Sequence, residues 1–174
     1  CLEKLRELPK EEKNLLLNHF KQFIEADKKV TLFEFVLYTI LHRQLGPKAG
    51  HATKIRFKHI GQVLDACVLI LSVMAIVGHS DSASRKKAFN AGTSYLDLGP
   101  QRLVESGFNL TDVKNALDDI HDLAIMPRMK ILKAVVETVL SDNQIRTREA
   151  EFLRSVAEAL DCPIPPILST TSFS

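Results

Sequence analysis

The chain has 174 residues, of which 45% are hydrophobic and 25% charged. This length and balance exclude disordered, collagen-like and disulfide-framework proteins, and they predict one soluble globular domain that buries roughly 70% of its extended surface. The formal net charge of +2 is too close to neutral to indicate a nucleic-acid partner. Any electrostatic partner must therefore be argued from local clusters of charge.

Cysteine usage bears on the compartment. Cys1, Cys67 and Cys162 form no CxxC pair, and their odd number favours free thiols in a reducing compartment such as the cytosol. The chain begins at Cys1 without a basic or apolar signal region, which is typical of a piece of a longer protein. A lipoprotein whose mature chain begins at a lipidated Cys1 is the alternative, although residues 2–12 have a helical pattern and not that of a flexible tether.

Apolar residues recur at helical spacing throughout, which predicts an all-α fold of about seven helices in one domain over residues 1–168, followed by a frayed tail over 169–174. The first helix begins near Pro9, which suits a first helical residue. Its inward side would be formed by Leu16, Phe20, Phe23 and Ile24. The second helix spans residues 32–45 and is apolar almost all round, so its neighbours must cover it on several sides.

The third predicted helix spans about residues 60–78 and contains the longest apolar run, which only Ser72 interrupts between residues 66 and 78. This run would rise roughly 20 Å as a helix, short of the ~30 Å hydrocarbon layer of a membrane. It therefore predicts a buried central helix. The fourth helix follows Asp81 as its N-cap and ends at about Leu98.

The last three predicted helices follow Gly99 and Pro100. The fifth is capped by Thr111, the sixth starts near Pro127, and the seventh ends before Pro163. The inward stripe of the fifth helix is expected to contain Val113, Ala116, Leu117, Ile120 and Leu123.

An internal repeat appears when Asp142 is aligned with Asp27, because both segments then have the pattern D-x-x-[VI]-x-x-x-E. Each copy is a helix, a short acidic turn and a second helix, which together form an αα-hairpin whose apolar faces need a partner. The repeat therefore predicts a pseudo-symmetric helical domain.

The acidic turns have a structural and a functional interpretation. Asp27 and Asp142 can accept backbone N–H bonds where the first helix of each hairpin ends, and Thr31 with Glu34 fits a capping box, which accounts for the spacing. If the two turns met, four carboxylates could instead bind a divalent cation weakly. That metal site would consist of Asp27, Glu34, Asp142 and Glu149.

Basic residues gather in one acid-free stretch between Glu34 and Asp65. The favoured interpretation is a solvated loop. The alternatives are contact with anionic lipid headgroups and, less favoured still, contact with nucleic-acid phosphates. The candidate anion-contacting residues are Arg43, Lys48, Lys54, Arg56 and Lys58.

Two further groups of chemically versatile residues receive a structural interpretation. The cluster Asp118, Asp119, His121 and Asp122 falls opposite the apolar stripe of its helix, which favours a solvated face over a metal site. Cys67 lies within the apolar run and is expected to pack as a small hydrophobe without a base beside it.

The segments DKKVTLFEFVLYTILHRQL, DACVLILSVMAIVGH and REAEFLRSVAEALDCPIPPIL, in this order, resemble the C-terminal domain of bacterial integral-membrane zinc metallopeptidases of the HtpX and CAAX-protease type. That domain is similar to the TerB-like helical domain of tellurite resistance, which has an acidic A-D-G-x-[VI]-x-x-x-E turn. Here Lys28 and Asn143 replace the glycine of that turn.

The resemblance implies that transmembrane helices and a zinc peptidase module precede this chain in a parent protein, at the cytoplasmic side of the bacterial inner membrane. No histidine of the chain belongs to an HExxH motif, so the zinc and its chemistry are expected in that other module. We therefore expect a non-catalytic regulatory or interaction domain without a cofactor of its own. Its partner would be the peptidase or membrane module or another protein, and the alternatives are a metal-responsive stress module and a membrane-surface binding module.

Overall fold

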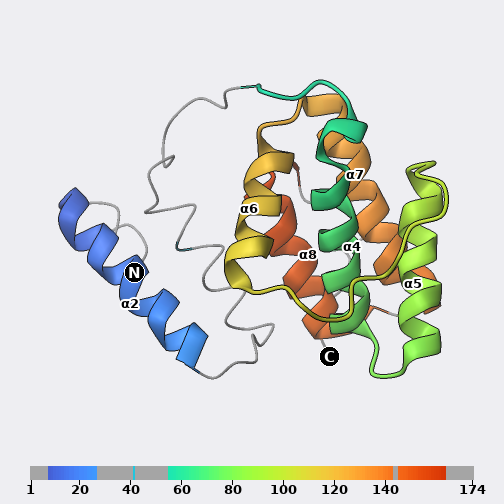
Figure 1. Ribbon diagram of the computed structural model, residues 1–174, viewed down its shortest axis with the longest axis horizontal. Coiled ribbons are helices and arrows are strands. Elements are labelled where there is room, and N and C mark those ends of the chain that lie inside the picture. The colour runs from blue at the N-terminus through green and yellow to red at the C-terminus, as the bar shows by residue number, and fades with distance from the viewer. Residues whose placement is uncertain (1–7, 27–40, 42–54, 143–144, 164–174) are drawn as a thin grey trace. The chain divides into compact units, whose positions relative to one another are not determined.

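The computed structural model describes residues 8–26, 41, 55–142 and 145–163 (Figure 1). The chain divides into two compact units, Cys1–Thr53 and Lys54–Ser174. The described part of the first unit contains the helix α2 (Lys10–Ala26). The described helices of the second unit, with η for 3-10 helices, are η1 (Ile60–Val63), α4 (Leu64–Gly78), α5 (Ser82–Tyr95), α6 (Leu110–His121), α7 (Ile125–Val139), η2 (Leu140–Asp142) and α8 (Thr147–Ala159). The predicted all-α class is confirmed for these residues, whose β-type pairing is limited to one isolated bridge between Phe57 and Leu123.

Helix α2 begins directly after Pro9, whose carbonyl accepts the N–H of Lys13 at 3.0 Å. Leu17 is buried on this helix, while the neighbouring Leu15 is 56% exposed, which gives α2 one apolar side. Leu16 is half-buried. The side chains of Phe20, Phe23 and Ile24 lie outside the described residues, and so does the predicted helix over residues 32–45.

Helix α4 is the central element of the second unit, as its apolar run predicted. It contacts α5, α6, α7 and α8, and Figure 1 shows it between them. Cys67, Ile70, Leu71 and Ala75 have no exposed surface. A helix that is covered on every side has to be apolar on every side. With the η1 turn it is long and apolar enough, by length and composition, to cross a membrane, and in this structure much of it is buried by the surrounding helices.

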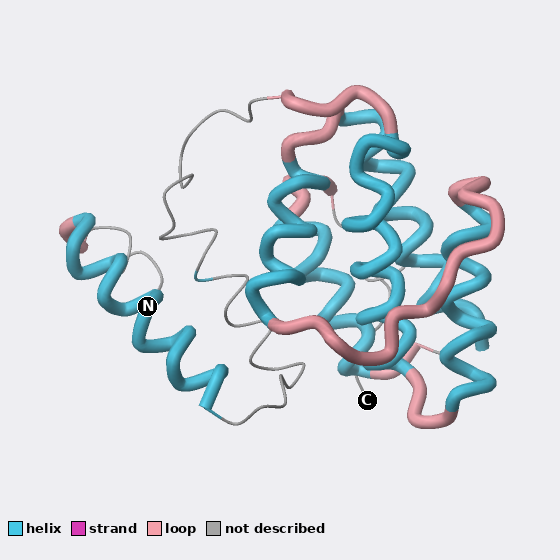
Figure 2. The backbone as a smooth tube through the Cα atoms, in the orientation of Figure 1, coloured by secondary structure: helices cyan, strands magenta, loops and turns pink. Residues whose placement is uncertain are grey.

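Ser72 is the polar interruption of this apolar helix, and its hydroxyl has two partners. Its Oγ donates to the carbonyl of Val68 at 2.7 Å and accepts the N–H of Val104 at 3.1 Å. Val104 belongs to the long connection between α5 and α6, which is drawn as a loop in Figure 2. A buried N–H must find an acceptor, so the serine ties this connection to the core helix.

We expect Ser72→Ala to lower the free energy of unfolding by about 1–2 kcal/mol, because it leaves the N–H of Val104 without its acceptor. The local effect is measurable as faster hydrogen exchange of the Val104 amide. Thr93→Ala is the matched control, since the Thr93 hydroxyl contacts only carbonyls of its own helix. Unchanged exchange at Val104 in Ser72→Ala would contradict this role.

Both ends of α5 are set by residues close to them in the sequence. Asp81 is its N-cap, as predicted, and accepts the N–H of Ser84 at 2.8 Å, a bond that lowers the pKa of the carboxyl. The helix ends at Tyr95, earlier than the predicted Leu98. Asp97 adopts the left-handed conformation with φ 54°, and the N–H of Leu98 turns back to the carbonyl of Thr93. Such a residue ends a helix much as a glycine does.

The starts of α6 and α7 differ from the predictions. Asn109, and not Thr111, is the N-cap of α6, because its Oδ1 accepts the N–H groups of Thr111 and Asp112 and leaves Thr111 inside the first turn. Helix α7 begins at Ile125, before the predicted Pro127. A proline fits anywhere in the first turn, where N–H groups have no partner within the helix. The predicted stripe of α6 is confirmed as buried: Val113, Ala116, Leu117, Ile120 and Leu123.

Helices α5 and α7 lie close together at Gly92. A β-carbon at this position would overlap Thr138 Oγ1 and would lie 2.9 Å from Leu71 Cδ2 and 3.0 Å from the carbonyl oxygen of Ala134. Thr138 itself is fixed, since its hydroxyl donates to the carbonyl of Ala134 at 3.0 Å. Only glycine lets the two backbones come this close.

Helices α7 and α8, joined through η2, form the helix–turn–helix unit that the second copy of the repeat predicted. The inner side of α8 is fully buried at Phe152, Leu153, Val156, Ala157 and Leu160. The helix ends before Pro163, as predicted, at a second left-handed aspartate, Asp161 with φ 52°. Most of the first copy lies outside the described residues, so the repeat itself stays a prediction.

Candidate functional site

The second acidic turn is held together by an arginine. Arg146 Nη2 lies 3.2 Å from Asp142 Oδ2, and Arg146 Nη1 lies 3.3 Å from Glu149 Oε1. The backbone N–H of Arg146 also donates to Glu149 Oε2 at 2.7 Å, and its Nη1 donates to the carbonyl of Gly78 at 3.0 Å. The guanidinium thus joins the end of α4 to the start of α8. The carbonyl of Gly78 lies at the C-terminus of α4, and a helix C-terminus favours a positive charge.

This geometry bears on the predicted metal site. Asp142 and Glu149, the two candidates that the structure describes, share the Arg146 guanidinium, which occupies the place that a cation would take between them. Asp27 and Glu34 lie outside the described residues. Within the described part of the chain, no three His, Cys, Asp or Glu side chains form a group that could hold a metal ion. The partner shown for the described half of the set is Arg146, and both the backbone bonds expected of Asp142 and the four-carboxylate site stay predictions.

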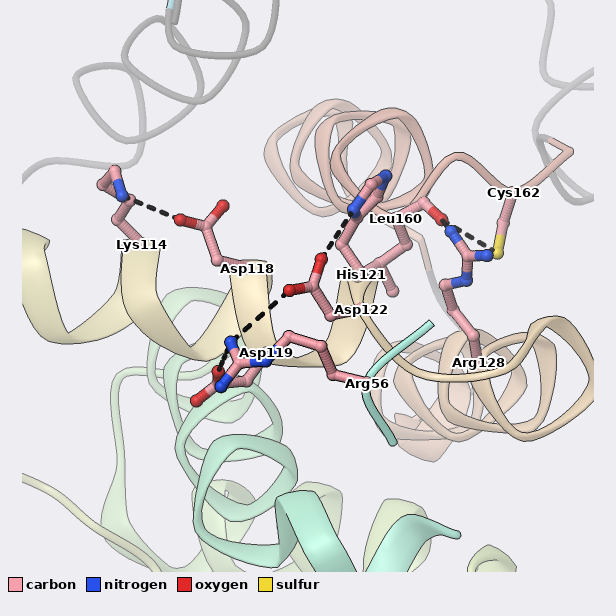
Figure 3. Close-up of polar contacts among 9 residues, drawn as sticks. All are labelled: Arg56, Lys114, Asp118, Asp119, His121, Asp122, Arg128, Leu160 and Cys162. Atoms are coloured by element: carbon pink, nitrogen blue, oxygen red, sulfur yellow. Dashed lines mark hydrogen bonds and ion pairs between the residues drawn. The ribbon is translucent and has the colours of Figure 1, made fainter. Parts of the chain in front are cut away.

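The acidic end of α6 is partly what the sequence predicted (Figure 3). Asp118 and Asp119 lie on the half-exposed face, and Asp118 pairs with Lys114 Nζ at 2.8 Å. For Asp122 the predicted solvated position is wrong, because the residue is only 4% exposed. It follows the last residue of α6 and so leaves the periodicity of that helix.

Asp122 is buried because residues 55–59, the segment before η1, pair with it. Its carbonyl accepts the N–H groups of Arg56 at 2.8 Å and Phe57 at 3.2 Å, and Ala124 donates back to the carbonyl of Phe57 at 2.9 Å. Figure 3 shows its carboxylate directed at Arg56, whose Nη1 lies 3.5 Å from Oδ2, and at His121, whose Nδ1 lies 3.6 Å from Oδ1. Two segments that are distant in sequence are joined by this pairing.

A buried arginine that sequence reasoning missed closes the other end of α8. Arg128 is 5% exposed, and its Nη1 donates to the carbonyl of Leu160 at 2.7 Å (Figure 3). Cys162 Sγ lies 3.5 Å from the same oxygen. The guanidinium therefore caps the C-terminus of α8. No sequence pattern signals this role, because the contact joins residues from different helices.

The two described thiols lie in the protein interior. Cys67 and Cys162 are free and buried, as expected for unpaired cysteines, and burial raises the pKa of Cys67 to about 12. A thiolate is the nucleophilic form of cysteine, so this thiol is inert at neutral pH. The prediction that Cys67 packs as a small hydrophobe is confirmed, whereas Cys1 lies outside the described residues.

An apolar groove of about 630 Å³ lies between the start of α7, the end of α5 and the segment before η1. Its lining consists of Lys58, His59, Ile60, Tyr95, Met126, Pro127, Met129, Lys130 and Lys133. All of these residues belong to the second unit. The groove is not encoded by any local motif, because three separate stretches of the chain contribute to it.

Two sets of hydrogen bonds hold the groove in shape. Gln62 Oε1 accepts the N–H groups of Lys58 at 2.8 Å and His59 at 3.1 Å, which fixes one wall on η1. The bonds between Phe57 and the residues around Ala124 fix that wall to the start of α7. The groove is therefore positioned by backbone structure and does not depend on the conformation of a free loop.

Exposed apolar side chains contribute to this lining. The described part of the second unit has four exposed large hydrophobic side chains, and two of them, Tyr95 (37% exposed) and Met126 (73%), line the groove. Ile125 (46%) directly precedes Met126, and Ile55 (58%) lies three residues before Lys58 in the sequence. Single exposed apolar residues are ordinary, but a group of them beside a concave surface indicates a binding site.

The predicted basic set is divided by the structure. Lys58 lies at the groove, whereas Arg56 is engaged with Asp119, at 3.9 Å, and Asp122, and its guanidinium lies 5.0 Å from the centre of the Phe57 ring. Arg43, Lys48 and Lys54 lie outside the described residues. Lys130 and Lys133, which had no place in the prediction, are the other cations of the groove.

Comparison with known proteins identifies no relative. No family model matches the chain, and neither a curated protein nor a solved structure does. The likeness to the C-terminal domain of zinc metallopeptidases therefore depends only on the three sequence segments that show it.

Proposed function

We propose that this chain is a non-catalytic interaction module that binds a protein partner in the groove between α5, α7 and the segment before η1. The observation that supports this most directly is that two exposed apolar side chains, Tyr95 and Met126, line one concave surface whose wall is fixed by hydrogen bonds. Folding normally buries such side chains, and a partner that covers them gains the same hydrophobic free energy.

The setting of the potentially reactive groups supports a module without chemistry of its own. Cys67 has a raised pKa, and the carboxylates of Asp142 and Glu149 are paired with Arg146. His79 Nε2 lies 3.4 Å from Ser141 Oγ, a long contact for a nucleophile and its base.

For the parent protein we propose a membrane-bound zinc metalloendopeptidase of the HtpX and CAAX-protease type, in which this module lies on the cytoplasmic side and regulates access of substrates. The support for this part is the sequence resemblance. The coding region before Cys1 tests it, because the proposal requires an HExxH motif behind hydrophobic spans. If the parent protein lacks that motif, the peptidase part of the proposal is refuted, and the proposed binding of a partner in the groove is unaffected.

A selection of random peptides on the immobilised chain tests the groove. We expect the enriched peptides to lose most of their binding, by about tenfold or more, to the Met126→Asp variant, which places a charge in the apolar lining. Met126 is 73% exposed, so the substitution leaves folding intact. Leu15→Asp, at an exposed leucine of α2, is the matched control and should bind normally. Enriched peptides that bind both variants equally would refute the groove as the binding surface.

A further inference from the structure

The charge around the groove is one-sided. Lys58, Lys130 and Lys133 line it, its described lining includes no Asp or Glu, and the nearby Asp97, 88% exposed, lies 3.8 Å from Lys130 Nζ. An exposed ion pair of this kind contributes little, so it competes weakly with a partner carboxylate. The same lining contains apolar side chains, among them Tyr95 and Met126.

The start of α7 adds to this positive potential. The N-cap position of α7 is Ala124, which offers no side chain to the first turn, and that turn holds no acidic residue. Each other described α-helix of the second unit has a capping side chain or an acidic residue in its first turn: Asp65 in α4, Asp81 for α5, Asn109 and Asp112 for α6, and Glu149 in α8. The uncompensated end of the α7 dipole therefore lies beside the lysines of the groove and favours the same sign of ligand charge.

The apolar side chains that line the groove can adjust to ligands of different shape. Met126 and Met129 are two of the three methionines in the chain, and both line the groove. Methionine is unbranched and polarisable, so methionine-rich surfaces adjust to peptide side chains of different shape. A groove of about 630 Å³ has room for the apolar side chains of a peptide.

From this combination we infer that the groove binds an acidic, apolar peptide segment of a partner protein, whose aliphatic side chains lie on Tyr95, Met126 and Met129 and whose carboxylates face Lys58, Lys130 and Lys133. This inference rests on the proposed function and specifies the chemistry of the partner. Apolar contacts would provide affinity, and the lysines would select the charge of the segment.

Fluorescence anisotropy with the full chain tests the inference. The probes are two labelled peptides with leucines at positions i and i+4, flanked by three glutamates on each side in one peptide and by three lysines in the other. We expect the acidic peptide to bind at least about tenfold more tightly, with an affinity that falls as salt is added. Lys58→Glu with Lys133→Glu should weaken it about tenfold. Lys86→Glu with Lys87→Glu, an equal charge change at exposed positions of α5, should leave its affinity nearly unchanged.

The other possible results distinguish a failure of this inference from a failure of the proposed function. If both peptides bind equally and Met126→Asp abolishes both, the acidic partner is wrong while the groove remains a binding surface. If the two double variants weaken binding equally, the selection is for bulk charge and the inference fails. If vesicles of anionic phospholipid bind the chain in a Met126-dependent way and neither peptide does, the groove meets a membrane. The proposed function fails separately, when the random selection yields no peptide that depends on Met126.

Discussion

Replacing Gly92 with alanine should lower the free energy of unfolding by about 3 kcal/mol, at the upper end of the usual cost of overpacking a core. The added methyl group would overlap Thr138 Oγ1 and press on Leu71 Cδ2 and the carbonyl oxygen of Ala134. The last of these is helix backbone and cannot rotate away. Helix α7 must therefore move from α5, and this movement would disturb the packing of α7 on α4 as well.

Chemical denaturation followed by circular dichroism measures this loss, and Gly61→Ala is the matched control. Gly61 has no heavy atom near the position of a β-carbon and no positive φ, so its replacement should be neutral or stabilising by up to about 1 kcal/mol. Adding Thr138→Ala to Gly92→Ala should recover only part of the loss, because the contacts with Leu71 and Ala134 remain. A Gly92→Ala variant as stable as the wild type would show that α5 and α7 do not approach so closely.

Features that depend on one helix were predictable from the sequence. The central position of α4 followed from an apolar run without a polar face, and the inward stripe of α6 followed from its spacing. The N-cap Asp81 was predictable because its bond to the N–H of Ser84 joins neighbours in the chain. In each case the physical cause lies within a few turns of one helix.

Features that depend on pairing between distant segments were not predictable. Asp122 had the sequence position of a solvated residue, and only its pairing with Arg56 and Phe57 buries it. The same pairing brings Lys58 to the start of α7 and so creates the groove. The cap that Arg128 provides at Leu160 has the same origin. The end of α5 before Asp97 was missed for another reason, since a left-handed aspartate has no distinctive pattern.

The second acidic turn provides the other large effect. Gly78→Ala should lower the free energy of unfolding by about 2 kcal/mol, since the added methyl group overlaps Glu149 Oε1 and drives out a buried carboxylate. On leaving, Glu149 would give up the N–H of Arg146 at 2.7 Å and its guanidinium at 3.3 Å. Thermal and urea denaturation measure the loss, and Gly61→Ala again controls for the change from glycine to alanine.

A double-mutant cycle identifies the cause of that loss. Glu149→Ala alone should cost about 1–2 kcal/mol, as the removal of a helix N-terminal acceptor usually does. Because the overlap disappears together with the carboxylate, Gly78→Ala combined with Glu149→Ala should be no less stable than Glu149→Ala alone. Additive losses would mean that Gly78 is required for another reason than room for Glu149.

The cycle also separates the two interpretations of the acidic turn. If Glu149 is a structural acceptor for Arg146, Glu149→Gln should keep much of the stability, because the amide oxygen still accepts the N–H, and calcium, magnesium or zinc should not raise the unfolding temperature of the wild type. If Glu149 binds a cation, these ions should stabilise the wild type in proportion to the logarithm of their concentration and should leave Glu149→Gln unaffected. The contacts of Arg146 with both carboxylates, at 3.2 and 3.3 Å, make the first result the expected one, because a cation would have to displace the guanidinium from Asp142 and Glu149 before it could bind.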